Sequence, residues 1–310
     1  MVIAFRRHDF ITLIGAALAT LGLSVMAGTR SASKAAPTQV HVARQRVTFS
    51  SGDLALSGVL YRPQGRGPFP ALMWNHGSEK TPGAGPQFDT VASIFVPAGY
   101  VVFAPVRRGH GYSKGRYIGD VINQTQAAEG FEAAHRMAVH LLETEQLDDQ
   151  LSGLADVKQL AFVDPDRIAV AGCSYGGIQT LLGAERNVGY KAAISISPAA
   201  LSWAHNSFLR KRLIQSFQKI NIPVLLLQPA RDASLEPSRV LGAEAARLGK
   251  SLTTTKSTHV DPGGIGAPRR AFGEACRAVA SQRQKLKRRS AWSPSTLTPR
   301  SKRSPTSTKC

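Results

Sequence analysis

Cysteine is scarce in this chain of 310 residues, which holds only Cys173, Cys276 and Cys310. An odd number of widely separated cysteines cannot form a complete disulfide framework, and these positions lack the close spacing of zinc ligands. We therefore expect neither a small disulfide-rich fold nor a metal site built on cysteine. Cys173, beside Ser174, is expected to pack as a small apolar residue.

Acidic residues are also few: 20 Asp and Glu stand against 39 Lys and Arg, which gives a formal net charge of +19. A charge of this size often indicates a nucleic-acid partner or an anionic membrane. The excess is concentrated at the chain ends, with +5 in residues 1–46, +3 in residues 47–250 and +11 in residues 251–310. Because the central part is nearly balanced, we predict no specific nucleic-acid partner. Nonspecific polyanion binding by the basic C-terminal segment is the alternative.

Long apolar runs are missing too, because the apolar stretch at residues 10–25 is shorter than a typical membrane span. Arg6 and Arg7 precede this stretch and the small-residue region 27–36 follows it, an arrangement typical of an export signal. The arginine pair resembles that of a bacterial twin-arginine signal with one extra residue of spacing. We predict an export signal over residues 1–36 and a periplasmic or extracellular location, with an uncleaved N-terminal membrane anchor as the alternative.

Residues 45–260 have the pattern of one α/β domain. Short apolar runs predict strands at 47–61 (a hairpin that turns at 51–53), 71–75, 100–105, 168–171, 192–195 and 224–228. Helical composition predicts helices at 88–98, 126–160, 178–186, 207–219 and 238–248, the longest divided in two near 148–149 or 152–153. Strands that alternate with helices indicate a mostly parallel sheet with helices on both faces.

The most informative motif is the Gly-x-Ser-x-Gly sequence of residues 172–176, which joins an apolar strand to a helix. A sharp strand-to-helix turn strains the backbone of Ser174 and exposes its hydroxyl, and the flanking glycines remove side chains that would clash. The backbone N–H of Tyr175 then lies at the helix start, where it can stabilise an oxyanion. The motif predicts Ser174 as a nucleophile and Tyr175 as one oxyanion donor; a plain tight turn is the alternative.

A serine nucleophile needs a base, and the base needs an acid that orients it. An elbow of this kind goes with the chain order Ser, then Asp or Glu, then His. Asp232 follows the apolar run 224–228 and is the candidate acid, with Glu236 as the alternative. His259 is the candidate base, because His205 comes before the next strand end.

A second loop after a strand begins with His76, Gly77 and Ser78. In such sheets this loop supplies the other oxyanion N–H, so we assign that donor to Ser78 or its neighbour. His76 precedes the nucleophile and is expected to be a structural histidine. The polar loop 107–111 either shapes the pocket or forms a solvated turn.

Together these motifs resemble those of the α/β-hydrolases, and most closely the bacterial dienelactone-hydrolase and prolyl-oligopeptidase catalytic-domain group. The resemblance covers about residues 45–250 and rests on His76-Gly77-Ser78, Arg108-Gly109-His110-Gly111-Tyr112-Ser113, Asp164-Pro165-Asp166-Arg167-Ile168 and Gly172-Cys173-Ser174-Tyr175-Gly176-Gly177. It implies an eight-stranded sheet, a Ser-His-Asp triad and neither a metal nor an organic cofactor. Dienelactone hydrolases carry Cys at the elbow centre, so Ser174 favours a general ester or a peptide-like acyl group.

The resemblance ends soon after Lys250. The family's closing strand, its Gly-His loop and its aromatic-rich last helix have no matching residues here, and residues 261–310 form a basic stretch with few aliphatic residues. Such a composition predicts a disordered tail. We expect the closing strand and helix to be missing or altered, through a frameshift in the gene or the sequence record.

The sequence thus predicts a serine hydrolase that cleaves a small carboxylic ester through an acyl-enzyme. Two alternatives remain open. One is a peptidase or amide hydrolase of the prolyl-oligopeptidase type with a peptide-like substrate. The other is a catalytically impaired hydrolase-like protein with an altered C-terminus, since the neighbours of His259 do not match the family pattern.

Overall fold

The computed structural model describes residues 42–83, 87–250 and 252–257. The domain opens with an antiparallel hairpin, β1 (Arg44–Ser51) and β2 (Leu54–Tyr61). Gly52 turns the chain with a φ of 54°, a left-handed conformation that glycine adopts without steric cost. The hairpin predicted from the sequence is therefore confirmed.

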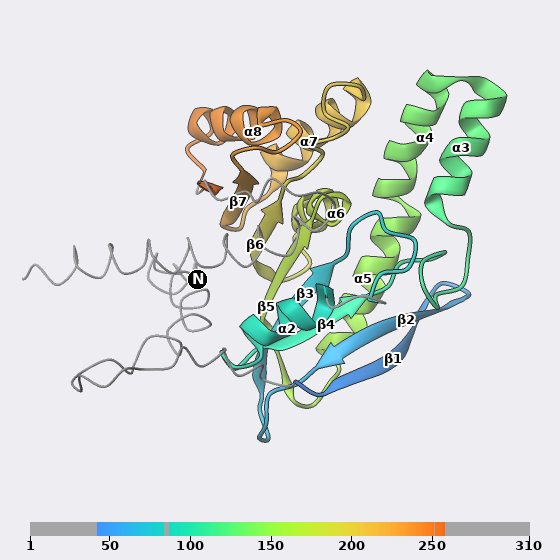
Figure 1. Ribbon diagram of the computed structural model, residues 1–310. Helices are drawn as coiled ribbons and strands as arrows, with labels where there is room; N and C mark the ends of the chain where they lie inside the picture. The colour runs from blue at the N-terminus through green and yellow to red at the C-terminus, as the bar shows by residue number, and fades with distance from the viewer. Residues whose placement is uncertain (1–41, 84–86, 251, 258–310) are drawn as a thin grey trace, which may run out of the picture.

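The hairpin leads into an eight-stranded sheet with the strand order β1-β2-β4-β3-β5-β6-β7-β8. β2 pairs antiparallel with both β1 and β4, and every later pairing is parallel, so the predicted mostly parallel sheet is confirmed (Figure 1). The remaining strands are β3 (Phe69–Asn75), β4 (Val101–Pro105), β5 (Val163–Cys173), β6 (Tyr190–Ile196), β7 (Val224–Pro229) and β8 (Leu252–Ser257).

Helices cover both faces of the sheet, because alternate residues of each strand point to opposite sides. Met73, Phe103 and Val170 belong to the core layer that packs against α4 to α8, whereas Leu72 and Val102 belong to the layer that packs against α2. The flanking helices are α2 (Gln87–Phe95), α6 (Tyr175–Glu185), α7 (Ser207–Lys219) and α8 (Glu236–Arg247).

The long helical segment differs from the sequence prediction. It forms α3 (Ile118–Glu129), α4 (Phe131–Glu143) and α5 (Glu145–Lys158), with breaks at Gly130 and Thr144 in place of 148–149 or 152–153. α3 and α4 form a helical hairpin at the upper right of Figure 1. All four predicted breakers lie inside α5, and two of them face the rest of the domain: Asp149 is a buried ion partner, and a Cβ on Gly153 would lie 3.1 Å from the Phe103 ring.

The closing strand is present as β8, so of the two expectations for it, missing or altered, the first is wrong. It pairs in parallel with β7 over its whole length, from Leu252 opposite Val224 to Ser257 opposite Pro229. Three consecutive threonines at 253–255 favour this strand, since β-branched residues suit extended backbone. The predicted export signal at 1–36, the predicted tail at 261–310 and the closing helix lie outside the described residues.

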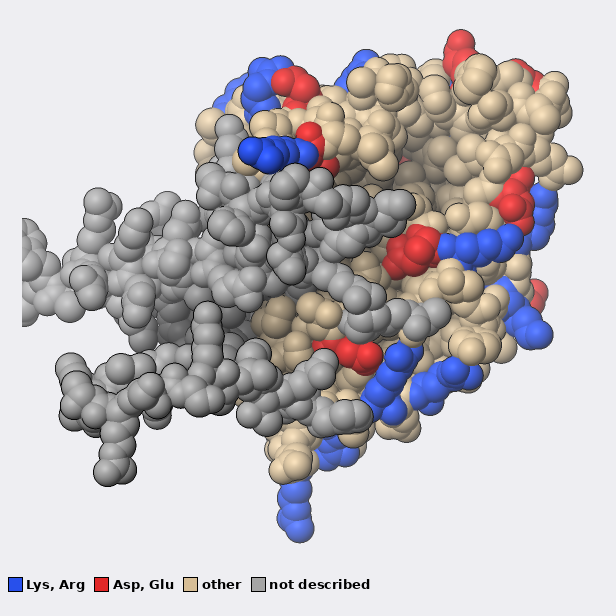
Figure 2. All heavy atoms as spheres, in the orientation of Figure 1, with Lys and Arg blue, Asp and Glu red and all other residues tan. Residues whose placement is uncertain are grey.

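Surface charge on the described domain is mixed. Lys and Arg side chains alternate with Asp and Glu on the face seen in Figure 2, in keeping with the near balance of residues 47–250. Within residues 42–257, apart from the undescribed positions 84–86 and 251, no helix is long and apolar enough to cross a membrane.

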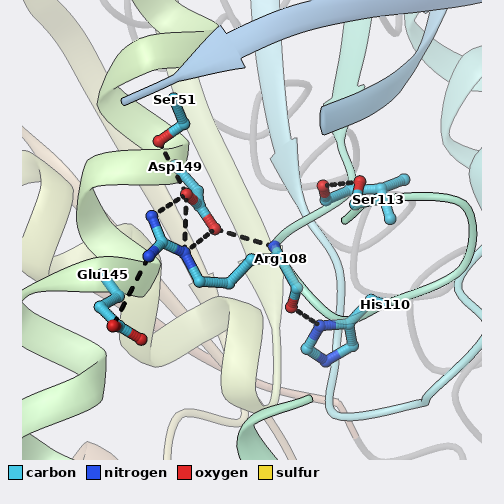
Figure 3. Close-up of polar contacts among 7 residues, drawn as sticks. Ser51, Arg108, His110, Ser113, Glu145 and Asp149 are labelled. Atoms are coloured by element: carbon cyan, nitrogen blue, oxygen red, sulfur yellow. Dashed lines mark hydrogen bonds and ion pairs between the residues drawn. The ribbon is translucent and has the colours of Figure 1, made fainter. Parts of the chain in front are cut away.

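One buried ion pair fastens the loop after β4 to α5 and the first hairpin (Figure 3). Asp149 is fully buried, and its carboxylate accepts from Arg108 Nη2 at 2.7 Å, from the Arg108 backbone N–H at 2.8 Å and from Ser51 Oγ at 2.8 Å. Glu145 lies 3.6 Å from Arg108 Nη1 at the outer end of the pair. Because removal of one partner leaves the other charge buried and uncompensated, the pair is a strong constraint on this loop.

We expect Asp149→Asn to lower the free energy of unfolding by about 3 kcal/mol, since it leaves the Arg108 guanidinium without its main counter-charge. Urea denaturation measures the change. The matched control is Asp148→Asn, which alters the exposed neighbouring carboxylate and is expected to cost less than about 1 kcal/mol. Equal losses in the two variants would contradict this account of the loop.

Candidate active site

Ser174 occupies the sharp turn between β5 and α6. Its backbone has a φ of 57° and a ψ of −116°, a strained conformation for a residue with a side chain, and the residue is exposed. The backbone N–H of Ser174 donates to Ile196 O at 2.9 Å, which ties the turn to the end of β6. The predicted elbow geometry is therefore confirmed, whereas the nucleophilic role remains a prediction.

The glycines of the elbow permit a close approach of backbone to backbone. A Cβ on Gly172 would lie 2.3 Å from Gly176 O, and a Cβ on Gly176 would lie 2.0 Å from Asn75 O and 2.6 Å from His76 O. The atoms that such a Cβ would meet belong to the backbone and cannot move aside as a flexible side chain could, so only glycine fits at positions 172 and 176. The first turn of α6 thus packs directly on the end of β3.

The two predicted oxyanion donors come from these touching segments. Tyr175 is the first residue of α6, where backbone N–H groups have no partner within the helix. Ser78 is exposed in the loop after β3, and its carbonyl accepts from Tyr117 Oη at 3.1 Å. A Cβ on Gly77 would lie 3.8 Å from Cys173 O, so the structure brings the two loops together.

His76 is a structural histidine, as the sequence predicts. It is fully buried, its Nε2 accepts the backbone N–H of Arg107 at 3.2 Å, and its Nδ1 lies 2.9 Å from Gly77 O. Burial, with the charges of Arg107 and His110, holds the pKa of His76 well below its usual range. A neutral imidazole with both nitrogens engaged is not available as a base.

Asp232 lies in the loop after β7, half-buried. Its carboxylate accepts from Gln228 Nε2 at 2.7 Å and from the backbone N–H of Ala233 at 2.8 Å, contacts that fix its orientation. Burial, together with the charges of Asp232 and Glu79, raises the pKa of Cys173 to about 12. β7 runs parallel to β6, and the end of β6 accepts the Ser174 N–H, so the Asp232 loop and the elbow lie at the same edge of the sheet. The alternative acid, Glu236, forms an exposed ion pair with Arg239.

Cys173 keeps a neutral thiol at physiological pH because of that raised pKa, and it packs against the apolar layer that includes α2. The expectation that it acts as a small apolar residue is confirmed. Across residues 42–257, positions 84–86 and 251 excepted, no group of three or more His, Cys, Asp or Glu side chains is placed to hold a metal ion.

The predicted base, His259, lies outside the described residues. β8 ends at Ser257, two positions earlier in the sequence, and it runs parallel to β7. The carboxyl end of β8 therefore lies at the same edge of the sheet as the Asp232 loop and the elbow. His205, which the chain order excludes, is exposed in the loop after β6.

The polar loop 107–111, for which pocket shaping and a solvated turn were both open, contributes two buried residues beside the site. Arg107 and His110 are fully buried, so the solvated-turn interpretation of residues 107–111 is wrong for both. Glu79 is exposed as a residue, but its carboxylate lies against Gly77, and the partial burial raises its pKa. The only sign of a buried Arg107 in the sequence is its position directly after an apolar strand. That position does not distinguish a buried arginine from one on the surface.

We expect Gly176→Ala to lower the free energy of unfolding by about 3 kcal/mol or more, because the new Cβ would overlap the backbone at the end of β3. Chemical denaturation of the purified variant measures the loss. Gly52→Ala is the control: it meets no atom within 4 Å and has only the strain of its positive φ, about 1 kcal/mol. A Gly176→Ala protein as stable as this control would contradict the close backbone contact.

His110 makes the domain sensitive to acid. Burial and the nearby Arg107 cation lower the pKa of His110 to about 4 from an ordinary 6.5, so the unfolded chain binds a proton more readily. The stabilising contribution of neutral His110 is therefore complete above pH 6.5 and is lost as the pH falls toward 4, by about 1.4 kcal/mol per pH unit. We expect His110→Asn, whose amide can still donate to Arg108 O, to show a shallower decline.

The matched control for that measurement is His140→Asn at an exposed position. Unfolding free energies of the three proteins are compared from pH 7 to pH 4. His140→Asn should follow the wild type, and a His110→Asn curve parallel to both would show that His110 does not cause the decline.

Comparison with known proteins agrees with this geometry. Residues 52–291, a range that includes Ser174, Asp232 and His259, match the family described as X-Pro dipeptidyl-peptidase (S15 family). Comparison of the sequence with curated proteins gives no match.

Solved structures show the same fold at low identity. Acylaminoacyl peptidase from Pyrococcus horikoshii superposes with a TM-score of 0.57 at 20% identity, covering 80% of this chain and 41% of that one. Dipeptidyl peptidase 4 from Porphyromonas gingivalis gives 0.56 at 17%, covering 77% and 35%. A dienelactone hydrolase-type protein from Klebsiella pneumoniae gives 0.53 at 17%, covering 81% and 98%.

The chain thus spans less than half the length of the two peptidases but nearly all of the dienelactone hydrolase-type protein. All three share the sheet and helices described above, and the resemblance to the α/β-hydrolases expected from the motifs is confirmed. Because the family match extends over most of the sequence, this chain belongs to the X-Pro dipeptidyl-peptidase (S15) family of serine hydrolases.

Proposed function

We propose that this protein hydrolyses a peptide or amide bond of a small substrate through an acyl-enzyme formed on Ser174. The observation that carries the proposal is the elbow: Ser174 has a φ of 57° and is exposed above the first turn of α6. An exposed serine at such a turn supports the role of nucleophile, and the backbone N–H of Tyr175 at the helix start supports the role of oxyanion donor.

Each step has a residue of this chain assigned to it. Ser174 Oγ attacks the substrate carbonyl while His259 takes its proton, and Asp232 orients and stabilises the resulting imidazolium. The N–H groups of Tyr175 and Ser78 hold the oxyanion, and His259 then returns the proton to the leaving amine. A water molecule, deprotonated by the same histidine, hydrolyses the acyl-enzyme and releases the acid.

The comparisons with known proteins favour a peptide-type substrate over a simple ester. The matching family carries the description X-Pro dipeptidyl-peptidase, and two of the similar structures are peptidases. Ester cleavage is the second candidate, because the dienelactone hydrolase-type neighbour has nearly the same extent as this chain. Both reactions use the same acyl-enzyme and differ in the leaving group. Export through residues 1–36 remains part of the proposal.

The predicted outcome for Ser174→Ala is a fall of about 10³-fold or more in kcat/KM, because the acyl-enzyme can no longer form. Wild type and variant are assayed on Xaa-Pro nitroanilides, aminoacyl amides and short-chain nitrophenyl esters. An active-site-directed fluorophosphonate should label the wild type and not Ser174→Ala. Higher selectivity for the amide substrates would support the peptidase assignment.

His259→Ala, assayed beside Ser174→Ala, should lose a similar factor, whereas His205→Ala at an exposed histidine should keep wild-type activity. Equal rates for wild type and Ser174→Ala would exclude the proposed mechanism. A folded wild type that resists the fluorophosphonate would instead favour the catalytically impaired alternative.

A further inference from the structure

Arg107 is a buried cation that forms no direct ion pair among the described residues, although the charges of Glu79 and Asp149 act on it from farther away. It follows β4, its residue is only 1% exposed, and no ion pair in the described part of the chain includes it. Burial lowers the pKa of Arg107 to about 10, so the guanidinium remains charged at neutral pH. A buried charge is costly, and its hydrogen-bond partners must therefore compensate for the lost hydration.

The hydrogen-bond acceptors of Arg107 all lie in the loop that supplies the second proposed oxyanion donor. Nη1 donates to His76 O at 2.9 Å, and Nη2 donates to Gly77 O at 2.6 Å. The backbone N–H of Arg107 donates to His76 Nε2 at 3.2 Å. Three donors from one residue thus hold two successive residues of this loop.

The bond to Gly77 O also determines the direction of the next N–H. In a planar trans peptide the C=O and the N–H point in opposite directions, and the Gly77–Ser78 bond is not among the cis bonds of the described chain. Because the buried Arg107 draws Gly77 O inward, the Ser78 N–H points away from the interior. Glycine at position 77 offers little resistance to a peptide flip, so the orientation depends on the two groups that donate to Gly77 O, the Arg107 guanidinium and His76 Nδ1.

The other face of the cation contacts the elbow. Arg107 Cζ lies 4.8 Å from the centre of the Tyr175 ring, a cation–π distance. Tyr175 carries the first oxyanion N–H, and Gly176 beside it packs on His76 O. One side chain therefore touches both segments that bear the proposed donors.

We propose that Arg107 is a positioning residue that holds the Gly77–Ser78 peptide in the orientation that directs the Ser78 N–H toward the oxyanion formed at Ser174. This inference rests on the proposed function of Ser174. Arg107 does not touch the substrate; it prevents the flipped peptide, which would present a carbonyl where a donor is needed.

The test is Arg107→Lys, which keeps the positive charge but loses the two-pronged donor. We expect kcat to fall about 10²-fold, the cost of losing one oxyanion donor, with KM changed less than threefold. Affinity for a peptide boronate, which forms a tetrahedral adduct on the serine, should fall by the same factor as kcat/KM. A merely structural role would not link these two losses.

Arg108→Lys is the matched control, because the adjacent arginine anchors its loop through Asp149 and touches neither donor segment. It should lower thermal stability while kcat and boronate affinity stay within about twofold of wild type. Arg107→Lys behaving like this control, or raising KM with kcat unchanged, would overturn the proposal.

A measurement on the wild type keeps the proposal falsifiable even if Arg107→Lys does not fold. The amide ¹⁵N and ¹H signals of Ser78 and Tyr175 should both shift when the boronate adduct forms. An adduct that moves Tyr175 and leaves Ser78 unchanged would refute the assignment of Ser78, and with it the role of Arg107. Failure of the wild type to react with fluorophosphonate at all would refute the proposed function instead.

Discussion

The candidate active site depends on direct backbone contact between the first turn of α6 and the end of β3. No side chain fits between them, since a Cβ on Gly176 would overlap Asn75 O and approach His76 O within 2.6 Å. This contact places the strained Ser174 beside the loop that begins at His76. Beneath both, the guanidinium of Arg107 supplies donors to carbonyls that lie at the end of a strand.

The sheet brings the rest of the site to the same edge. β3, β5, β7 and β8 run parallel in one sheet, with β6 between β5 and β7, so the loops at their carboxyl ends lie at the same edge. The proposed oxyanion loop follows β3, the proposed nucleophile Ser174 follows β5, and Asp232 follows β7. The presence of β8 also gives the chain a defined route to the edge at which His259 would have to act, a route that the sequence after Lys250 does not reveal.

Sequence patterns were sufficient to predict those parts of the fold that depend on interactions between residues close together in the chain. The elbow was predictable because its glycines and serine sit at fixed offsets, and α7 was predicted with its observed bounds, 207–219. Features that depend on contacts with residues far away in the sequence could not be predicted in this way. Asp149 resembles a helix breaker until its contact with Arg108 is known, and the burial of Arg107 depends on the loop after β3. Gly130, which was not predicted from the sequence as a helix end, follows the last residue of α3.

The pairing of β3 with β5 has a consequence for how the protein becomes active during folding. Asn75 pairs with Gly172, and between these positions the chain makes β4 and four helices. Contacts between residues this far apart in the sequence carry a loop-closure entropy that is lost before the contacts stabilise the fold. The elbow at Ser174 and the loop after β3 meet only once β3 has paired with β5. Assembly of the candidate site is thereby tied to this long-range pairing and cannot precede it.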